Sequence, residues 1–397
     1  MNKKFWMTAI ALAAAVAVCG WIGIRGEEVR AETASAGEIV MEAESGRVLY
    51  ERNSHVQLPM ASTTKILTAL IIIEDCNLDD MVTVPKEAVR VEGSSVYLQS
   101  GEKMSVKNLL YGLMLRSGND CAEALAIYHS GSVPAFAECM NERAAGYGAR
   151  NSHFANPHGL PAEGHYTTAF DLSLIACRAI RNDVFREIVS TKSVTVPDGG
   201  CGYARTFVNK NKMLFQYFGA NGIKTGYTKA AGRCLVTSAE REGMQLVSVV
   251  LDSPRMYERS AEILDNCFSS YNYKKVFDSE EFVCTIGTDV KGKFCNAKVG
   301  QDFCYPLKEK EIGDISYKID CPEKIRLPVY KGDEVGNLEI YLKNQLIFSQ
   351  KIYSINTVKK SYSDIIREIA EKYVYTRDYA DQQISGGERG GKPTGLR

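Results

Sequence analysis

The sequence predicts an α+β protein: an antiparallel sheet flanked by helices, followed by a small β-sandwich domain and a C-terminal amphipathic helix. Three observations predict this class. A hairpin pattern, several helical patterns and an apolar three-strand meander follow one another in the first part of the chain. Short β-rich runs separated by glycines and charged turns come next, and a stripe of apolar residues with helical period comes last. With 397 residues and 45% hydrophobic content, the chain can form two or three domains with real cores.

The first residues of the sequence indicate export. Two lysines precede an apolar run over residues 5–24, and polar residues with small-residue cleavage candidates follow. We expect a signal peptide over residues 1–31, with cleavage before Glu32; cleavage before Gly37 is the alternative. An uncleaved anchor is also open, because about twenty apolar residues can span a bilayer. In each case we expect the rest of the chain outside the cytoplasmic membrane.

Residues 37–275 are expected to form the first folded domain. Alternation of apolar and polar residues predicts strands, and recurrence every three or four residues predicts helices. The expected elements are a hairpin over residues 38–50 that turns at residues 44–47, helices over residues 63–75, after Asn119 and over residues 134–145, and strands over residues 234–239 and 244–251, with Lys224 on or just before the strand preceding them. This arrangement places Ser62 at the N-terminus of a buried helix.

After about residue 277 the sequence changes character. Short β-rich runs predict a small β-sandwich over residues 277–357, with strands over residues 282–286, 315–319, 338–342 and 346–355. An amphipathic helix is expected over residues 359–375, with an apolar stripe of Tyr362, Ile365, Ile366, Ile369, Ala370 and Tyr373. Such a helix either packs on the β domain or lies on a membrane surface. Residues 376–397 are glycine-rich and polar, and we expect them to be disordered.

Charge balance and residue spacing exclude several classes of function. Equal numbers of acidic and basic residues, 48 of each, give a net charge of zero, so we expect no nucleic-acid partner. No metal or other cofactor is expected, because the five histidines include no His-x-x-x-His pair and the cysteines lack paired Cys-x-x-Cys spacing. Disulfide bridges stay open. The best candidates are Cys284, Cys295, Cys304 and Cys321, whose pairing cannot be read from the sequence.

Three short motifs stand in one order along the chain. They are Ser62-Thr63-Thr64-Lys65, Ser117-Gly118-Asn119 and Lys224-Thr225-Gly226. The first spacing also occurs at Ser100-Gly101-Glu102-Lys103, but Gly101 and its polar neighbours predict a turn there rather than the start of a buried helix. Position and order therefore carry more specificity than any single string.

Ser62 and Lys65 have the spacing of a nucleophile and its base. Residues three apart on a helical turn project from one face, so the Lys65 amine can reach the Ser62 hydroxyl. Serine needs a base to take its proton before it attacks a carbonyl, and a lysine can do this only when it is neutral. Burial and a second cation, for which Lys224 is the candidate, lower a lysine's pKa. At a helix N-terminus, the backbone N–H of Ser62 can stabilise an oxyanion.

The other two motifs can supply proton transfer and substrate binding. Ser117 can relay a proton to the leaving group, and Asn119 can hold a substrate amide. The Lys224 cation and the Thr225 hydroxyl make a seat for a carboxylate, which predicts a substrate with a free C-terminus. Gly226 permits close approach of the substrate to the strand edge.

These motifs and the strings around them resemble the low-molecular-mass penicillin-binding proteins, in particular the serine D-alanyl-D-alanine carboxypeptidases. The resemblance runs from about residue 39 to about residue 260 and includes the strings Gly93-Ser94-Ser95, Asn156-Pro157-His158-Gly159-Leu160, Thr168-Ala169-x-Asp171, Asn209-x-Asn211 and Gly222-Ile223-Lys224-Thr225-Gly226-Tyr227-Thr228. It implies a β-lactamase/transpeptidase-like fold and removal of the terminal D-Ala from peptidoglycan stem peptides. It also implies that β-lactam antibiotics trap the acyl-enzyme as covalent inhibitors.

The resemblance further implies a role for each motif residue. The implied catalytic residues are Ser62 as the acylated nucleophile, Lys65 as its base and Ser117; the implied substrate-binding residues are Asn119, Lys224, Thr225, Gly226, Tyr227 and Arg259. Tyr227 enters through its backbone N–H, a second oxyanion donor. In similar proteins an arginine after the last sheet strand assists carboxylate binding, and Arg259 matches it better than Arg255.

Two other functions stay open. A β-lactamase needs an efficient way to hydrolyse its acyl-enzyme, such as a positioned glutamate and water. Glu163 is the only acidic residue in the loop over residues 156–165, and we expect it to face solvent. A weakly active, wall-binding protein of the same fold is the second alternative, against which the intact set of Ser62, Lys65 and Lys224 argues.

Overall fold

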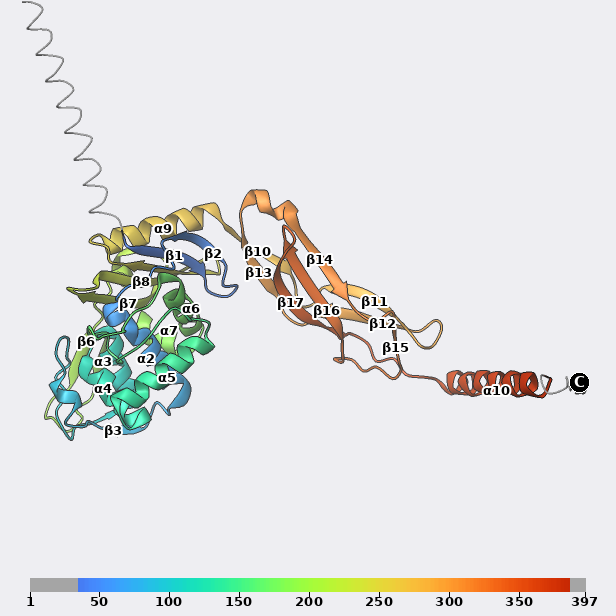
Figure 1. Ribbon diagram of the computed structural model, residues 1–397, viewed down its shortest axis with the longest axis horizontal. Coiled ribbons are helices and arrows are strands. Elements are labelled where there is room, and N and C mark those ends of the chain that lie inside the picture. Colours follow the sequence, from blue (N-terminus) through green and yellow to red (C-terminus); the bar gives the residue numbers. More distant parts are fainter. Residues whose placement is uncertain (1–34, 386–397) are drawn as a thin grey trace, which may run out of the picture. The chain divides into compact units, whose positions relative to one another are not determined.

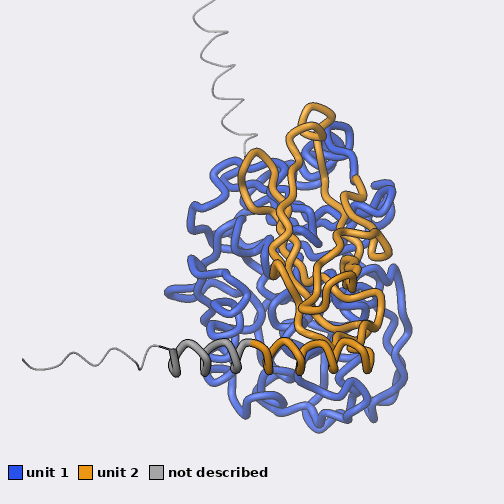
Figure 2. The backbone as a smooth tube through the Cα atoms, turned by 90° about the vertical axis from the view of Figure 1, so that its right-hand side faces the viewer, with its two compact units in different colours: residues 1–273 blue, residues 274–397 orange. Residues whose placement is uncertain are grey.

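The computed structural model describes residues 35–385, and the chain divides into two compact units (Figures 1 and 2). The first unit ends at Tyr273 and the second begins at Lys274. The export signal expected over residues 1–31 lies outside the described residues. Each unit has a hydrophobic core of its own.

A five-stranded antiparallel sheet forms the centre of the first unit. Its strands, in spatial order, are β2 (Val48–Arg52), β1 (Gly37–Glu42), β9 (Met244–Leu251), β8 (Gly232–Arg241) and β7 (Ala220–Thr228). The hairpin and the three-strand meander expected from the sequence therefore meet in one sheet, where β1 pairs with β9. Strand β7 lies at an edge, which leaves one side of its backbone open for a further strand.

Helices cover both faces of this sheet (Figure 1). Alternate strand residues enter different cores: Val40 and Val250 pack with α9, whereas Ile39 and Val249 pack with the helices on the other face. The α-helices of the unit are α2 (Lys65–Asp75), α3 (Val106–Leu115), α4 (Asn119–Ser130), α5 (Val133–Gly146), α6 (Ala169–Ile180), α7 (Asp183–Ser190), α8 (Met213–Gln216) and α9 (Met256–Ser270). This confirms the predicted α+β class, an antiparallel sheet flanked by helices.

Helix α2 is the central helix of the unit. A short 3₁₀ turn, η1 (Ala61–Thr64), leads directly into it, and its residues from Lys65 to Ile72 are all buried. Such burial explains why the helix sequence is almost wholly apolar rather than amphipathic. The short pairs β3 (Met81–Thr83) with β4 (Lys103–Ser105) and β5 (Ser193–Val196) with β6 (Arg205–Val208), and the turn η2 (Ala88–Arg90), complete the unit.

The second unit consists mainly of β-strands. Six strands form one sheet in the order β14 (Ile315–Asp320), β16 (Glu334–Leu342), β17 (Gln345–Ser354), β12 (Phe294–Val299), β11 (Phe282–Thr288) and β15 (Lys324–Ile325). Strands β10 (Asn272–Phe277) and β13 (Phe303–Leu307) pair separately, and the 3₁₀ turn η3 (Glu309–Asp314) precedes β14. The sequence predicts four of these strands, which are β11, β14, β16 and β17. The other strands are shorter or more polar and show no clear alternation of apolar and polar residues.

The C-terminal helix α10 (Tyr362–Ser385) continues beyond the expected end at residue 375. The segment expected to be disordered, residues 376–397, therefore overlaps this helix over residues 376–385. Alanine and glutamine in this segment favour a helix, and the first strong helix breakers are Gly386 and Gly387. Within residues 35–385, no helix combines the length and the apolar character that a bilayer crossing requires.

Candidate active site

Ser62 and Lys65 meet at the start of α2. Ser62 lies in the η1 turn and is partly accessible, whereas Lys65 begins α2 and is fully buried. The Lys65 Nζ lies 3.1 Å from the Ser62 Oγ. The chain therefore places an amine within hydrogen-bond distance of an accessible hydroxyl, as the three-residue spacing predicts.

Two further oxygen atoms hold the Lys65 amine. Its Nζ donates to Asn119 Oδ1 at 2.7 Å and to the backbone carbonyl of His158 at 2.6 Å. Burial, with the positive charge of Lys224 as the second cause, holds the pKa of Lys65 well below its ordinary value. A neutral amine has two hydrogens and one lone pair. Because Asn119 and His158 accept the two hydrogens, the lone pair is left to face the Ser62 hydroxyl.

The second motif stands at the start of α4, beside Lys65. Ser117 is buried and its backbone adopts a left-handed conformation with φ of 65°, which is strained for a residue with a side chain. Asn119 donates its amide Nδ2 to the Glu92 carbonyl at 2.5 Å. With Lys65 on its Oδ1, the Asn119 amide is already used at both ends and positions the lysine.

The third motif lies on the edge strand β7 and packs against η1. A Cβ added at Gly226 would lie 3.1 Å from the Ser62 backbone nitrogen and 3.2 Å from the Ala61 Cβ, so only glycine lets the strand approach this closely. Thr225 is partly accessible, and the Tyr227 side chain is exposed. Motifs one and three therefore share one site.

Lys224 is fully buried on β7, and its Nζ donates to the Thr225 carbonyl at 2.9 Å. Burial, together with the positive charge of Lys210, lowers the pKa of Lys224 to about 7. Lys210 is a residue that motif reading missed. It lies between Asn209 and Asn211, and its Nζ is 3.4 Å from the Ser94 Oγ.

Two histidines support the loop that carries the His158 carbonyl. His158 pairs with Glu123 on α4 at 3.4 Å, and His165 Nε2 lies 2.9 Å from Thr64 Oγ1. Burial lowers the pKa of both histidines, that of His165 to about 4. They are therefore neutral near pH 7. Among the described residues, no hydrogen bond joins either imidazole to Ser62. This agrees with a supporting role for the loop.

Arg259 does not lie beside Ser62, Lys65 and Lys224, although the resemblance implied that it binds the substrate carboxylate. Its guanidinium on α9 binds the Glu38 carboxylate at 2.8 and 2.9 Å and the Tyr50 hydroxyl at 2.7 Å. Glu38 lies on β1, three strands from β7 in the sheet order, or about 14 Å at the usual strand spacing. The geometry gives Arg259 a structural role; Arg255, the other candidate, is the N-terminal cap residue of α9.

One group of possible metal ligands exists among the described residues. Asp75, His129 and Cys139 bring one ligand atom each to within 4.8 Å of one another. Asp75 already accepts hydrogen bonds from His129 and Arg143, which balance its charge. The group lies at the far end of α2 from Ser62, about 15 Å along the helix axis, and takes no part in the site.

Residues 25–255 match the family model described as D-alanyl-D-alanine carboxypeptidase, which is more than half of the chain. The chain belongs to this family. Residues 271–360 match a second model, described as penicillin-binding protein 5, C-terminal domain. The family is that of low-molecular-mass penicillin-binding proteins, so the resemblance seen in the motifs is confirmed.

Individual relatives agree with the family models. The chain is 32% identical to D-alanyl-D-alanine carboxypeptidase DacF of Bacillus subtilis, over 85% of this chain and 89% of the relative. It is 37% identical to DacC of Escherichia coli, over 81% and 84% of the two chains. The structure of penicillin-binding protein 5 from Haemophilus influenzae is similar at 25% identity with a TM-score of 0.67, covering 83% of this chain and 98% of that one. The protein is a serine-type D-Ala-D-Ala carboxypeptidase, a peptidase that acts on peptidoglycan.

The first prediction concerns Arg259. Burial would raise the pKa of Glu38, but hydrogen bonds from Arg259 and its neighbours lower it to about 2. Arg259→Leu should destabilise the protein by about 2 kcal/mol, because it leaves a buried carboxylate with fewer partners. Thermal unfolding measures this loss. Since the folded pKa is depressed, the Glu38 contribution is complete above about pH 4.5 and disappears as pH falls toward 2.

Arg186→Leu is the matched control, because Arg186 forms an exposed pair with Asp183 and one long hydrogen bond, 3.4 Å, to the Ile180 carbonyl, so its loss should change stability little. The KM for a D-Ala-D-Ala peptide should stay unchanged in both variants. A raised KM in Arg259→Leu at unchanged thermal stability would contradict the structural role.

The second prediction concerns pH. The kcat/KM of the enzyme should rise with pH as Lys65 loses its proton, because only the neutral amine is a base. It should fall on the alkaline side as Lys224, with its pKa of about 7, loses the charge that a carboxylate needs. Lys224→Arg should move the alkaline limb up by more than about 2 pH units, since arginine stays charged.

Lys210→Gln should move the same limb to higher pH, because it removes a charge that lowers the pKa of Lys224. Lys86→Gln, at a lysine whose side chain is 79% exposed, serves as the control and should leave the profile in place. If the alkaline limb stays in place in Lys224→Arg, it does not report the deprotonation of Lys224.

Proposed function

We propose that this carboxypeptidase removes the terminal D-Ala of a peptidoglycan stem peptide through an acyl-enzyme on Ser62. The observation that carries this proposal is the Lys65 amine, which is buried, held by two acceptors and aimed at the Ser62 Oγ. The Ser62 Oγ attacks the carbonyl carbon of the penultimate D-Ala, and its proton passes to the Lys65 Nζ. Two backbone N–H groups, those of Ser62 and Tyr227, are the proposed donors to the oxyanion.

Collapse of the tetrahedral intermediate then releases the terminal D-Ala. Its amine needs a proton to leave, and Ser117 is the proposed relay for that proton from Lys65. The peptide is now bonded to the Ser62 Oγ as an ester. A water molecule attacks the carbonyl carbon of this ester and gives a proton to the Lys65 Nζ. The bond from that carbon to the Ser62 Oγ then breaks, the shortened peptide leaves with a new terminal carboxylate, and Lys65 returns a proton to the Ser62 Oγ. A β-lactam that acylates Ser62 in the same way remains bound as long as this last step is slow.

The edge strand β7 offers the substrate a place to bind. An extended peptide can pair with the open side of β7, and Gly226 keeps that approach unobstructed. Lys224 and Thr225 are the proposed partners of its terminal carboxylate. With the pKa of Lys224 at about 7, arrival of a carboxylate favours the charged form, so substrate and cation stabilise each other.

A β-lactamase is not favoured by the site. Glu163, the one acidic residue of the loop over residues 156–165, is exposed. The other carboxylate of interest, Glu123, pairs with His158 rather than with Ser62. No geometry here supports a glutamate that activates water for rapid deacylation. We expect slow turnover of β-lactams.

Helix α10 is proposed to lie on a membrane surface. Its apolar stripe is exposed, with side chains of Tyr362 89%, Ile366 66%, Ile369 60% and Tyr373 76% accessible, and none of these four belongs to the core cluster of the second unit. Ion pairs of Lys293 with Asp364 and of Lys360 with Asp289 hold the start of the helix to the turn between β11 and β12. An exposed stripe that the unit leaves uncovered favours insertion among lipid headgroups. We expect this surface to face the outer leaflet of the cytoplasmic membrane, on the side where the peptidoglycan lies.

The third prediction tests the nucleophile. Ser62→Ala should reduce D-Ala release from a D-Ala-D-Ala peptide at least about 1,000-fold, because it removes the hydroxyl that hydrogen-bonds the buried amine. Mass spectrometry after benzylpenicillin treatment should show the penicilloyl adduct on Ser62 in the wild type and none in the variant.

Ser100→Ala is the matched control, since Ser100 begins the second Ser-x-x-Lys string but lies exposed in a turn. It should keep both activity and labelling. D-Ala release that survives in Ser62→Ala would refute the proposed mechanism, and fast hydrolysis of a chromogenic cephalosporin by the wild type would favour the β-lactamase reading.

The fourth prediction tests the membrane surface. Ile366→Asn with Ile369→Asn should weaken binding to phosphatidylglycerol vesicles on the order of 100-fold, because two exposed isoleucines lose their apolar contact. Cosedimentation measures binding, and Glu371→Gln on the polar face is the control. Equal binding by the wild type and the double variant would exclude the stripe as the membrane contact.

A further inference from the structure

Two cysteines of the second unit, Cys284 on β11 and Cys321 after β14, lie side by side. Both are free thiols, the Cys321 thiol is among the near neighbours that act on the Cys284 thiol, and both side chains pack against the hydrophobic core of the unit. The sequence alone left four cysteines of this region as bridge candidates, without a pairing. The fold distinguishes among them.

The pairing of β11 with β15 brings the segments that carry the two cysteines together. β11 and β15 pair in parallel, with Gly287 opposite Lys324 and Thr288 opposite Ile325. Cys284 lies three residues before Gly287, and Cys321 lies three residues before Lys324, so the two cysteines stand on the segments that enter this parallel pair from the same end. A disulfide needs a Cα separation of about 4.4–6.8 Å. Neighbouring strands about 4.8 Å apart bring two segments within that reach.

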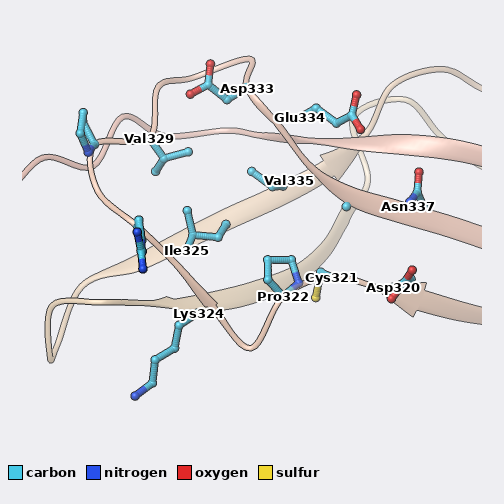
Figure 3. Close-up of a pocket in the computed structure, with 13 residues that line it drawn as sticks. Asp320, Cys321, Pro322, Lys324, Ile325, Val329, Asp333, Glu334, Val335 and Asn337 are labelled. Carbon is cyan, nitrogen blue, oxygen red and sulfur yellow. The ribbon is translucent and has the colours of Figure 1, made fainter.

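Cys321 is also fixed from the other side. A Cβ added at Gly336 on β16 would lie 2.9 Å from the Cys321 Cβ and 2.5 Å from the Asp320 carbonyl, so β16 packs closely on this residue. Cys321 lines an open pocket of about 870 Å³, where Figure 3 shows it directly after Asp320 and beside Pro322. A small oxidant can therefore reach its sulfur.

The place where these cysteines meet is a weak point of the sheet. Strands β14 and β15 stand at opposite ends of the sheet order, yet residues 321–323 join them directly. The connection therefore closes the sheet on itself, and β15 holds it with a strand of two residues, Lys324–Ile325. A covalent link at this point would stabilise the closed sheet where few backbone hydrogen bonds hold it.

We propose that Cys284 and Cys321 form a disulfide bridge that fastens the β14–β15 connection to β11 in the exported protein. Cys295 is the nearest competitor on β12, but its thiol is buried and contacts the Ser354 hydroxyl at 3.1 Å. The peptidoglycan on which the family acts lies outside the cytoplasm, where thiols are not kept reduced by the cytosolic pools.

The bridge forms by thiol–disulfide exchange with an external disulfide. One cysteine thiolate attacks a sulfur of that disulfide, which releases one thiol and leaves a mixed disulfide. The second cysteine then attacks the mixed disulfide and releases the other thiol. The two protein thiols lose two electrons and two protons, and the external disulfide gains both to become two thiols.

Peptide mapping of the full chain tests the pairing. The purified protein is incubated with oxidised glutathione, remaining thiols are alkylated, and trypsin is added without reductant. Trypsin separates all four cysteines of the region, because it can cleave after Lys291, Lys298 and Lys318. We expect one linked peptide pair that contains Cys284 and Cys321, lighter than the sum of its thiol forms by two hydrogen atoms. Alkylation of both cysteines, or a link from either to Cys295 or Cys304, would overturn the proposal.

Calorimetry tests whether the bridge stabilises the second unit. Reduction should lower the unfolding temperature of the second unit by roughly 10 °C, because the bridge closes a loop of roughly 40 residues. Oxidised Cys284→Ser and Cys321→Ser should each unfold like the reduced wild type, whereas Cys295→Ala, the control, should keep the bridge and the response to reductant. A mapped bridge whose reduction leaves the transition unmoved would overturn the stabilising role.

Discussion

The burial of two lysines beside one serine is the constraint on which the first unit depends. A buried ammonium group loses several kcal/mol of hydration, and a second positive charge nearby adds repulsion. The fold meets this cost at Lys65 with an amide oxygen from Asn119 and a carbonyl from His158. The part of this cost that the two acceptors do not offset lowers the pKa of Lys65. A lysine with a lowered pKa can be neutral near pH 7, and only a neutral lysine is a base. The unfavourable burial and the chemistry are thus the same interaction.

Several distant features follow from that constraint. Helix α2 has to be enclosed on every side over Lys65–Ile72, so this stretch is apolar apart from Lys65 itself and Thr68. The loop that brings the His158 carbonyl must press against η1, and a side chain at Gly159 would collide with the Ala61 carbonyl; its φ of 88° is likewise suited to glycine. Strand β7 has to remain at an edge, because a sixth strand there would close the site to substrate.

Sequence reasoning picked out Ser62 and Lys65, which the structure brings together, but not the groups that hold them in place. Helical context distinguished Ser62 from Ser100, since that information is local. The string Thr168-Ala169-x-Asp171 matched a family pattern, and the structure supplies its physical reason: the Thr168 hydroxyl caps α6 by accepting the Asp171 N–H. The Arg259 assignment failed because it depends on strand order. A position after the last strand does not reveal that α9 directs this side chain to β1 rather than β7.

The same division between local and remote information separates the strands of the second unit. The long hairpin of β16 and β17 alternates along its length and was readable. The two residues of β15 have no pattern to read, yet their pairing with β11 closes the sheet. Motif spacing can name the groups that react, because nucleophile and base lie on one helical turn. Protonation of the base and closure of a sheet are set by carbonyls and strands from remote parts of the chain, and these become visible only once the chain is folded.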